Sequence, residues 1–267
     1  MTGKIPTAAV KSAAAVLLAI GSLAITAGGA SAALTRVVYN NLNTVAPTVN
    51  GLPNEDTYSL DSEHFPVGGM VEFTKRPGVL KSLTTQVDSF TCEHGVYSFE
   101  NCYTARPQKK FHYEMTAEVY EVGAHNEAIG PIATSTATFK LPYRPTTNVT
   151  CLSTGEGKGF GPNCDVGGVL ATIVFKRFTP ATAVLPEKAI ITITAGSNPA
   201  ADIVNVGLQA SYKEFAGGEF VEEPAAHGGV PEVGSDPLPE AIFTNGLINE
   251  TEDWRGFQPV FEVTAAL

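Results

Sequence analysis

The chain contains 267 residues, of which 43% are hydrophobic and 16% charged, and its 27 acidic and 17 basic side chains give a formal net charge of −10. This apolar share suffices for a folded core, which excludes disorder of the whole chain. The acidic surplus excludes nucleic acid and anionic lipid as partners, because binding to either depends on Lys and Arg neutralising phosphates.

The first 32 residues have the layout of a secretory signal. Two lysines precede an uncharged apolar run at 13–27, and Ala30-Ser31-Ala32 supplies the small residues that a signal peptidase requires. The run is too short for a comfortable membrane span. We therefore expect a helical signal peptide at 1–32, of bacterial type, and a secreted single domain at 33–267 with no stable membrane anchor. Removing the two lysines leaves 15 basic and 27 acidic side chains, a charge of −12.

Apolar and polar residues alternate along most of the remaining chain. In FHYEMTAEVYEV (111–122) every second residue from Phe111 to Val119 is apolar, the pattern of a half-buried strand. Further strands are predicted, in chain order, at 36–40, 69–74, 79–90, 131–142, 169–178, 189–195, 203–210 and 259–265. We place 169–178 in the middle of a sheet because it is apolar on both faces. The strands predict an all-β fold, an antiparallel β-sandwich of jelly-roll or Ig-like type.

Four cysteines in an exported chain imply two disulfides, for which three pairings exist. We predict that neighbours pair, Cys92 with Cys102 and Cys151 with Cys164, because this closes two local loops without forcing distant strands together. The spacings are too wide for a zinc site. The glycine-rich segment GEGKGFG is therefore interpreted as part of a clipped loop, since a phosphate loop would need a following helix.

No catalytic residue is assigned. The chain after the signal has no G-x-S-x-G elbow, and its five histidines show no metal-binding spacing. No metal site or cofactor is assigned either. Calcium is the one metal that we retain as a hypothesis, because the acidic stretches 54–63 and 219–240 offer oxygen ligands without the spacing of a calcium-hand loop. The long acidic stretch 213–240 has no role that we can assign.

Four aromatic residues are the candidate ligand contacts: Trp254, the only tryptophan, and Tyr97, Tyr103 and Phe160 on or near the clipped loops. Exposed aromatic rings with a polar edge suit wet binding sites such as those for sugars. The alternative for each is ordinary packing.

The order of short segments resembles a group of exported bacterial β-sandwich proteins of uncharacterised function. The segments are RVVYNNL, LTTQVDSF before the first cysteine pair, ATFKLPYRP, the second cysteine pair, VNVGL and the closing WRGFQPVFEVTA. The resemblance spans most of the chain after the signal, except the acidic stretch 213–240, and it implies fold and export.

These observations favour a secreted, non-enzymatic binding protein of the cell envelope or extracellular space, with glycans or envelope components as partners. The first alternative is a hydrolase acting on polysaccharide, which would need two converging carboxylates. The second is a structural surface component that assembles with itself.

Overall fold

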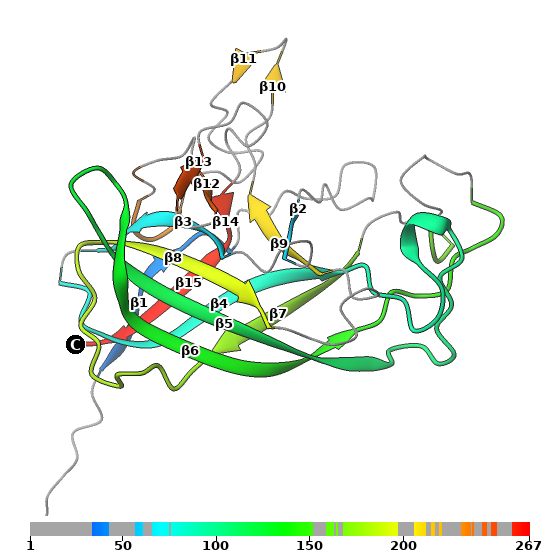
Figure 1. Cartoon of the computed structure of the whole chain (residues 1–267), viewed down its shortest axis with the longest axis horizontal. Helices are drawn as coiled ribbons and strands as arrows, with labels where there is room; N and C mark the ends of the chain where they lie inside the picture. The colour runs from blue at the N-terminus through cyan, green and yellow to red at the C-terminus, as the bar shows by residue number, and fades with distance from the viewer. Residues whose placement is uncertain are drawn as a thin grey trace, which may run out of the picture. The chain divides into compact units, whose positions relative to one another are not determined.

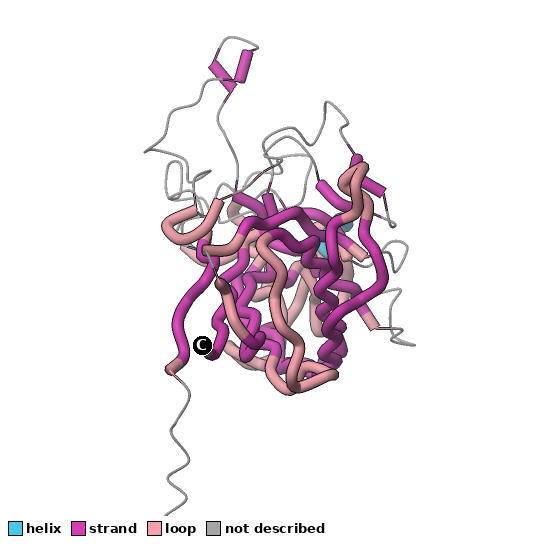
Figure 2. Tube along the Cα trace, turned by 90° about the vertical axis from the view of Figure 1, so that its left-hand side faces the viewer, coloured by secondary structure: helices cyan, strands magenta, loops and turns pink. Residues whose placement is uncertain are grey.

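In the residues that it describes, the computed structural model consists of β-strands joined by loops and a short helical turn (Figures 1 and 2). It describes residues 34–42, 57–60, 66–74, 76–151, 159–162, 164, 168–196, 206–211, 215–216, 219–220, 231–235, 237, 242–244, 247–249 and 258–267. The predicted signal peptide and Trp254 lie outside these residues, so the structure leaves both predictions as they stand. No helix among the described residues is long and apolar enough to cross a membrane.

The described strands form two large antiparallel sheets. The first has seven strands in the order β1 (Thr35–Asn40), β15 (Phe261–Ala266), β4 (Val79–Ser89), β9 (Val206–Ser211) and β14 (Gln258–Pro259), with β2 (Thr57–Ser59) on β9 and β7 (Val169–Phe175) on β4. The second has six strands in the order β13 (Leu247–Asn249), β12 (Ile242–Thr244), β3 (Val67–Glu72), β8 (Lys188–Ala195), β5 (Lys110–Val122) and β6 (Ala128–Pro142). A separate pair consists of β10 (Phe215–Ala216) and β11 (Glu219–Phe220). The all-β, antiparallel prediction is confirmed.

Strand β5 shows how the sequence produces a two-sided sheet. Its side chains at 111, 113, 115, 117 and 119 are all buried, whereas His112 and Glu114 between them are exposed. Strand β6 pairs with β5 over almost its whole length, and the exposed hydroxyls of Thr116 and Thr136 lie 2.8 Å apart. The strand predicted at 131–142 therefore lies within β6, the antiparallel partner of β5.

The core lies between the two sheets and takes side chains from both. The first sheet contributes Val38, Leu83, Val87, Phe175 and Val263, among others, and the second contributes Val71, Met115, Val119, Ile191 and Ile193. All ten are at most 1% exposed. Each such side chain stabilises the fold by roughly 1.5–3 kcal/mol, so this shared core holds the sheets face to face.

The prediction for strand 169–178 is wrong in its position. Among the described strands, β7 pairs with β4 alone and is therefore an edge strand. Its outer face carries Leu170 and Val174, which are 46% and 38% exposed. The central place belongs to the more polar β4, whose residues pair with β7 on one edge and with β15 and β9 on the other. Polarity does not prevent this, because the buried Thr85 hydroxyl donates a 2.7 Å hydrogen bond to the Val260 carbonyl.

Both predicted disulfides are present. Cys92 pairs with Cys102 and Cys151 with Cys164, with Cα–Cα distances of 5.2 and 5.5 Å. Each closes a short loop and contributes about 3 kcal/mol in the chain-entropy account. The first loop contains the helical turn η2 (Tyr97–Phe99).

Candidate functional site

Strand β6 at the edge of the second sheet and strand β7 at the edge of the first sheet run along a common seam, which is closed at one end. Here Thr134 and Thr179 exchange two backbone hydrogen bonds of 3.0 and 2.8 Å. The buried Ser135 hydroxyl donates a 2.6 Å hydrogen bond to the Lys176 carbonyl. The rings of Phe139 and Phe175 then meet edge to face, with 4.9 Å between their centroids.

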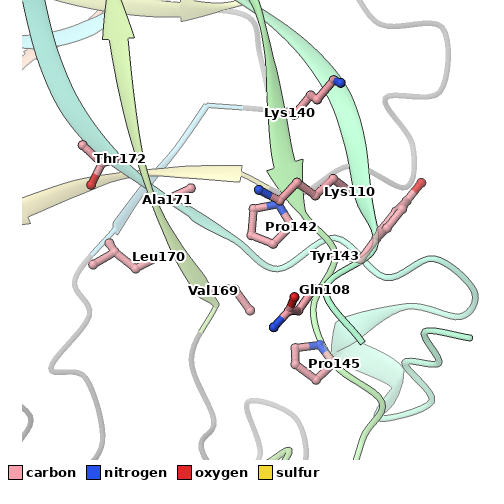
Figure 3. A pocket seen from close by; sticks show the side chains of 10 residues that line it. All are labelled: Gln108, Lys110, Lys140, Pro142, Tyr143, Pro145, Val169, Leu170, Ala171 and Thr172. Carbon is pink, nitrogen blue, oxygen red and sulfur yellow. The ribbon is translucent and has the colours of Figure 1, made fainter. Parts of the chain in front are cut away.

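At its other end the seam opens into a pocket of about 460 Å³ (Figure 3). The lining residues come from the turn before β5 with the first residue of that strand, the end of β6 with the segment after it, and the start of β7. They are Gln108, Lys110, Lys140, Pro142, Tyr143, Pro145, Val169, Leu170, Ala171 and Thr172. Figure 1 shows the two strands separating toward this end. An apolar lining with a few polar groups is the usual composition of a ligand site.

The charge of the pocket is opposite to that of the protein. Two of its ten described lining residues are lysines and none is an acid, although the chain as a whole carries a net charge of −10. Lys110 and Lys140 are both exposed, and no carboxylate among the described residues pairs with either. The neighbouring Lys109 differs, because its ammonium binds the carboxylate of Glu93. That contact, with the Ala105 N–H, holds the pKa of Glu93 below its usual value.

Gln108 reaches the pocket from a turn with unusual backbone geometry. The Lys109 N–H donates a 3.2 Å hydrogen bond to the Arg106 carbonyl, which closes a four-residue turn around Pro107 and Gln108. Gln108 has φ of +63°, as the third residue of a type II turn requires, and glycine is the usual residue there. A side chain in this region costs roughly 1–2 kcal/mol. The position of the glutamine amide at the pocket therefore lowers the stability of the fold.

The buried side chain of Arg144 anchors the part of the pocket wall that is formed by its two neighbours in sequence. It lies between Tyr143 and Pro145, which both line the pocket, and its own side chain is fully buried. The guanidinium sits between two aromatic rings, 4.7 Å from the centroid of Tyr97 and 4.8 Å from that of Phe160. Stacking on two ring faces offsets part of the cost of burying the charge, since a desolvated cation–π contact contributes about 2 kcal/mol.

The backbone around Arg144 is held equally firmly. Its N–H donates to the Thr91 carbonyl at 2.8 Å, and its carbonyl accepts a 2.6 Å hydrogen bond from the Thr104 hydroxyl. Next along the chain, the Thr147 N–H donates to Cys102 in the first clipped loop, and the Asn148 N–H donates to Gly159 in the second. The described parts of both disulfide loops thus belong to one unit built on Arg144, which we call the Arg144 unit (residues 91–104, 144–151, 159–162 and 164).

The three aromatic candidates that the structure describes lie in this unit and do not line the pocket. Tyr97 and Phe160 face Arg144. Tyr103 is 51% exposed and stacks on His94 at a centroid distance of 5.9 Å. Trp254 lies outside the described residues. The structure therefore brings Tyr97 and Phe160 together around a cation and leaves Tyr103 apart from them.

The pocket residues Lys110, Lys140 and Tyr143 were not among the sequence candidates. A usable signal existed, because a long hairpin over 111–142 places the start of its first strand beside the end of its second strand. Lysines at 110 and 140 then lie at the same end of the hairpin. Nothing in the sequence indicates that β7 opens a pocket beside them.

The structure contains no metal cluster in the part that it describes, since no three His, Cys, Asp or Glu side chains there are grouped to hold an ion. The acidic stretches of the calcium hypothesis lie largely outside the described residues, so that hypothesis is untested. Of the titratable groups elsewhere, Tyr120 on β5 is notable: burial, followed by a 2.6 Å hydrogen bond to Glu118, raises its pKa to about 12. Tyr120 is not a pocket residue.

Comparison with known protein families, curated proteins and solved structures finds no match to this chain.

Proposed function

We propose that this chain is an exported, non-enzymatic binding protein and that the pocket between β6 and β7 holds its ligand. The observation that carries the proposal is the lining of that pocket, in which an apolar floor carries two lysines, a glutamine amide and a tyrosine. Such a lining can orient a ligand through a few polar contacts while the floor excludes water. Export rests on the signal sequence, and the two disulfides are compatible with an oxidising compartment.

A glycan is the ligand class that we propose. Tyr143 and Pro142 offer apolar ring surfaces for the carbon face of a sugar. The Gln108 amide and the Thr172 hydroxyl can both donate and accept hydrogen bonds, as sugar hydroxyls do. The sandwich topology, of jelly-roll or Ig-like type, and membership of the group of exported bacterial β-sandwich proteins remain predictions alongside this function.

The hydrolase alternative finds no support in the lining of the pocket. Glycoside hydrolysis uses two carboxyl groups about 5–9.5 Å apart across the scissile bond. None of the ten described lining residues is Asp or Glu. We therefore keep binding, not hydrolysis, as the proposed activity of this pocket.

The structural-component alternative has one observation in its favour, the edge strand β7. Its outer face exposes Leu170 and Val174, and an edge with exposed apolar side chains is a place where another chain can add a strand. Light scattering over a concentration series distinguishes this role, since self-assembly predicts a mass that rises with concentration.

The binding proposal is tested by filling the pocket. Thr172 is exposed in the lining, so Thr172→Trp adds bulk there without disturbing the core. Thr182, exposed in the segment after β7, provides the matched control Thr182→Trp. In pull-down assays with purified cell-wall polysaccharides and on a glycan array, the wild type and the control should bind and Thr172→Trp should not. Equal binding by both variants, or no binding by the wild type, would contradict the proposal.

A further inference from the structure

We infer that the glycan held in this pocket is anionic and that Lys110 and Lys140 recognise its negative groups. This inference rests on the proposed function and adds the chemical class of the ligand.

The pairing of β5 with β6 brings the two lysines together. Lys110 lies opposite Pro142, and Lys140 lies opposite His112. The lysines are therefore diagonal neighbours on one face of the hairpin, a position in which backbones are about 7–8 Å apart. Both side chains line the same pocket (Figure 3), and each is long enough to turn toward a group placed between them. One carboxylate or phosphate could thus accept hydrogen bonds from both ammonium groups.

The overall acidity of the chain does not oppose this binding. At physiological ionic strength exposed charges farther apart than about 8 Å are largely screened. An anion in the pocket therefore senses Lys110 and Lys140 more strongly than the distant acids. The nearest described acid in sequence is Glu114, which lies opposite Thr138 on the same face of the hairpin; it does not line the pocket and forms no ion pair with either lysine. Glu93 is already bound to Lys109 and to the Ala105 N–H.

The remaining lining favours a sugar acid over a simple inorganic anion. Leu170, Ala171 and Pro142 provide apolar surface that an inorganic ion would not use. Gln108 adds a neutral amide that suits hydroxyl groups. A uronic-acid or phosphate-bearing oligosaccharide would use both the charged and the neutral parts of the lining.

Calorimetric titration of the mature chain tests the inference with four probes of similar length. These are a uronic-acid oligosaccharide, its methyl ester, a phosphate-bearing oligosaccharide and an oligoglutamate peptide. We expect binding of at least one of the two anionic glycans, weaker binding at higher salt, and at least about tenfold weaker binding of the methyl ester. Which of the two glycans binds more tightly identifies the anionic group.

Two double variants test whether Lys110 and Lys140 recognise the anionic glycan. Lys110→Gln combined with Lys140→Gln should weaken binding of the anionic glycan about tenfold, as expected for two exposed charge contacts. Lys81→Gln combined with Lys188→Gln makes the same charge change at exposed positions outside the pocket and should leave binding unchanged. Circular dichroism would show that both double variants are folded.

Four outcomes would overturn the inference. Equal binding of acid and methyl ester would leave the glycan-binding proposal standing but remove the anionic class. Equal weakening by both double variants would show that only net charge matters. Preference for the peptide, or failure of every oligosaccharide to bind, would reject the glycan class and with it the proposed function.

Discussion

The closed and open ends of the β6–β7 seam are made by the same two strands and differ in how those strands are joined. At the closed end, Thr134 and Thr179 share two backbone hydrogen bonds, and Phe139 packs on Phe175. At the open end, Pro142 and Pro145 occupy the corresponding wall, and proline has no N–H to offer a partner strand. The seam therefore closes where backbone donors and a facing pair of rings join the two strands, and a pocket remains where the prolines offer no such donors.

The closed end of the seam contributes to stability, and the open end provides the proposed binding site. Closed-end side chains such as Phe175 are fully buried, whereas Lys110, Lys140 and Leu170 at the open end are exposed. Changes at the closed end should mainly alter stability, and changes at the open end should mainly alter binding.

Phe175→Ala should give the largest loss of stability. Removing a fully buried ring leaves a cavity against Phe139 and should lower the free energy of unfolding by about 3–5 kcal/mol. Val174→Ala, at the neighbouring exposed position of the same strand, should cost less than about 1 kcal/mol. Urea denaturation measures both, and equal effects would show that the closed end is not a packed seam.

Arg144→Met should disturb the Arg144 unit and, through it, the pocket wall. Methionine removes two buried cation–π contacts but also the cost of burying the charge, so the free energy of unfolding should fall by at most about 4 kcal/mol. Limited proteolysis should then cut within both disulfide loops, because both pack around this guanidinium. Arg144→Lys, which keeps the charge but not the planar stacking surface, should give an intermediate result. Cleavage confined to one loop would contradict the single-unit description.

Gln108→Gly should separate stability from binding at the open end. Glycine adopts the positive φ of this turn without strain, which stabilises the folded variant. Glycine also gives the unfolded chain more conformational entropy, which offsets part of this gain. The free energy of unfolding should therefore be unchanged or higher by up to about 1 kcal/mol. Glycan binding should weaken because the amide is lost. Thermal unfolding and titration on the same samples check both parts, and lower stability with unchanged binding would contradict the role given to Gln108.

The smallest effect should be a change in acid sensitivity from Glu93→Gln. Because Lys109 and the Ala105 N–H lower the pKa of Glu93 in the folded state, its contribution is present above the unfolded value of 4.5. The contribution is lost as the pH falls through the folded value. The variant should therefore lose slightly less stability than the wild type between about pH 7 and about pH 3. Glu121→Gln, exposed on β5, is the control, and an identical change in both variants would exclude this role for Glu93.

Much of the fold could be predicted because the alternation of apolar and polar residues along a strand indicates which side chains are buried. Alternation along 111–122 gives the correct buried face of β5, and loop lengths between cysteines give the correct disulfides. The error at β7 arose because apolar residues on both faces were interpreted as central placement. Leu170 and Val174 lie instead on an exposed face. In the central strand β4, Thr85 is buried because its hydroxyl donates a hydrogen bond to the Val260 carbonyl, a contact that the local sequence pattern does not predict.

The candidate site was harder to predict because its parts come from three distant segments. Gln108, Tyr143 and Thr172 acquire a common role only when β6 and β7 lie along one seam. The aromatic residues chosen from the sequence were chosen for composition, and two of them, Tyr97 and Phe160, serve to enclose Arg144. Composition could not reveal this, because a buried arginine between two rings has no sequence spacing of its own.

The antiparallel β character and the two disulfide pairings could be predicted from the residues alone, since they depend on side-chain alternation and loop length within short segments. The folded chain was needed to show that β4 is central, that Arg144 joins the two clipped loops, and that two lysines line a pocket on an acidic chain. Those features depend on which strand edges meet and where they separate, and such contacts between distant segments are fixed by packing of the whole core.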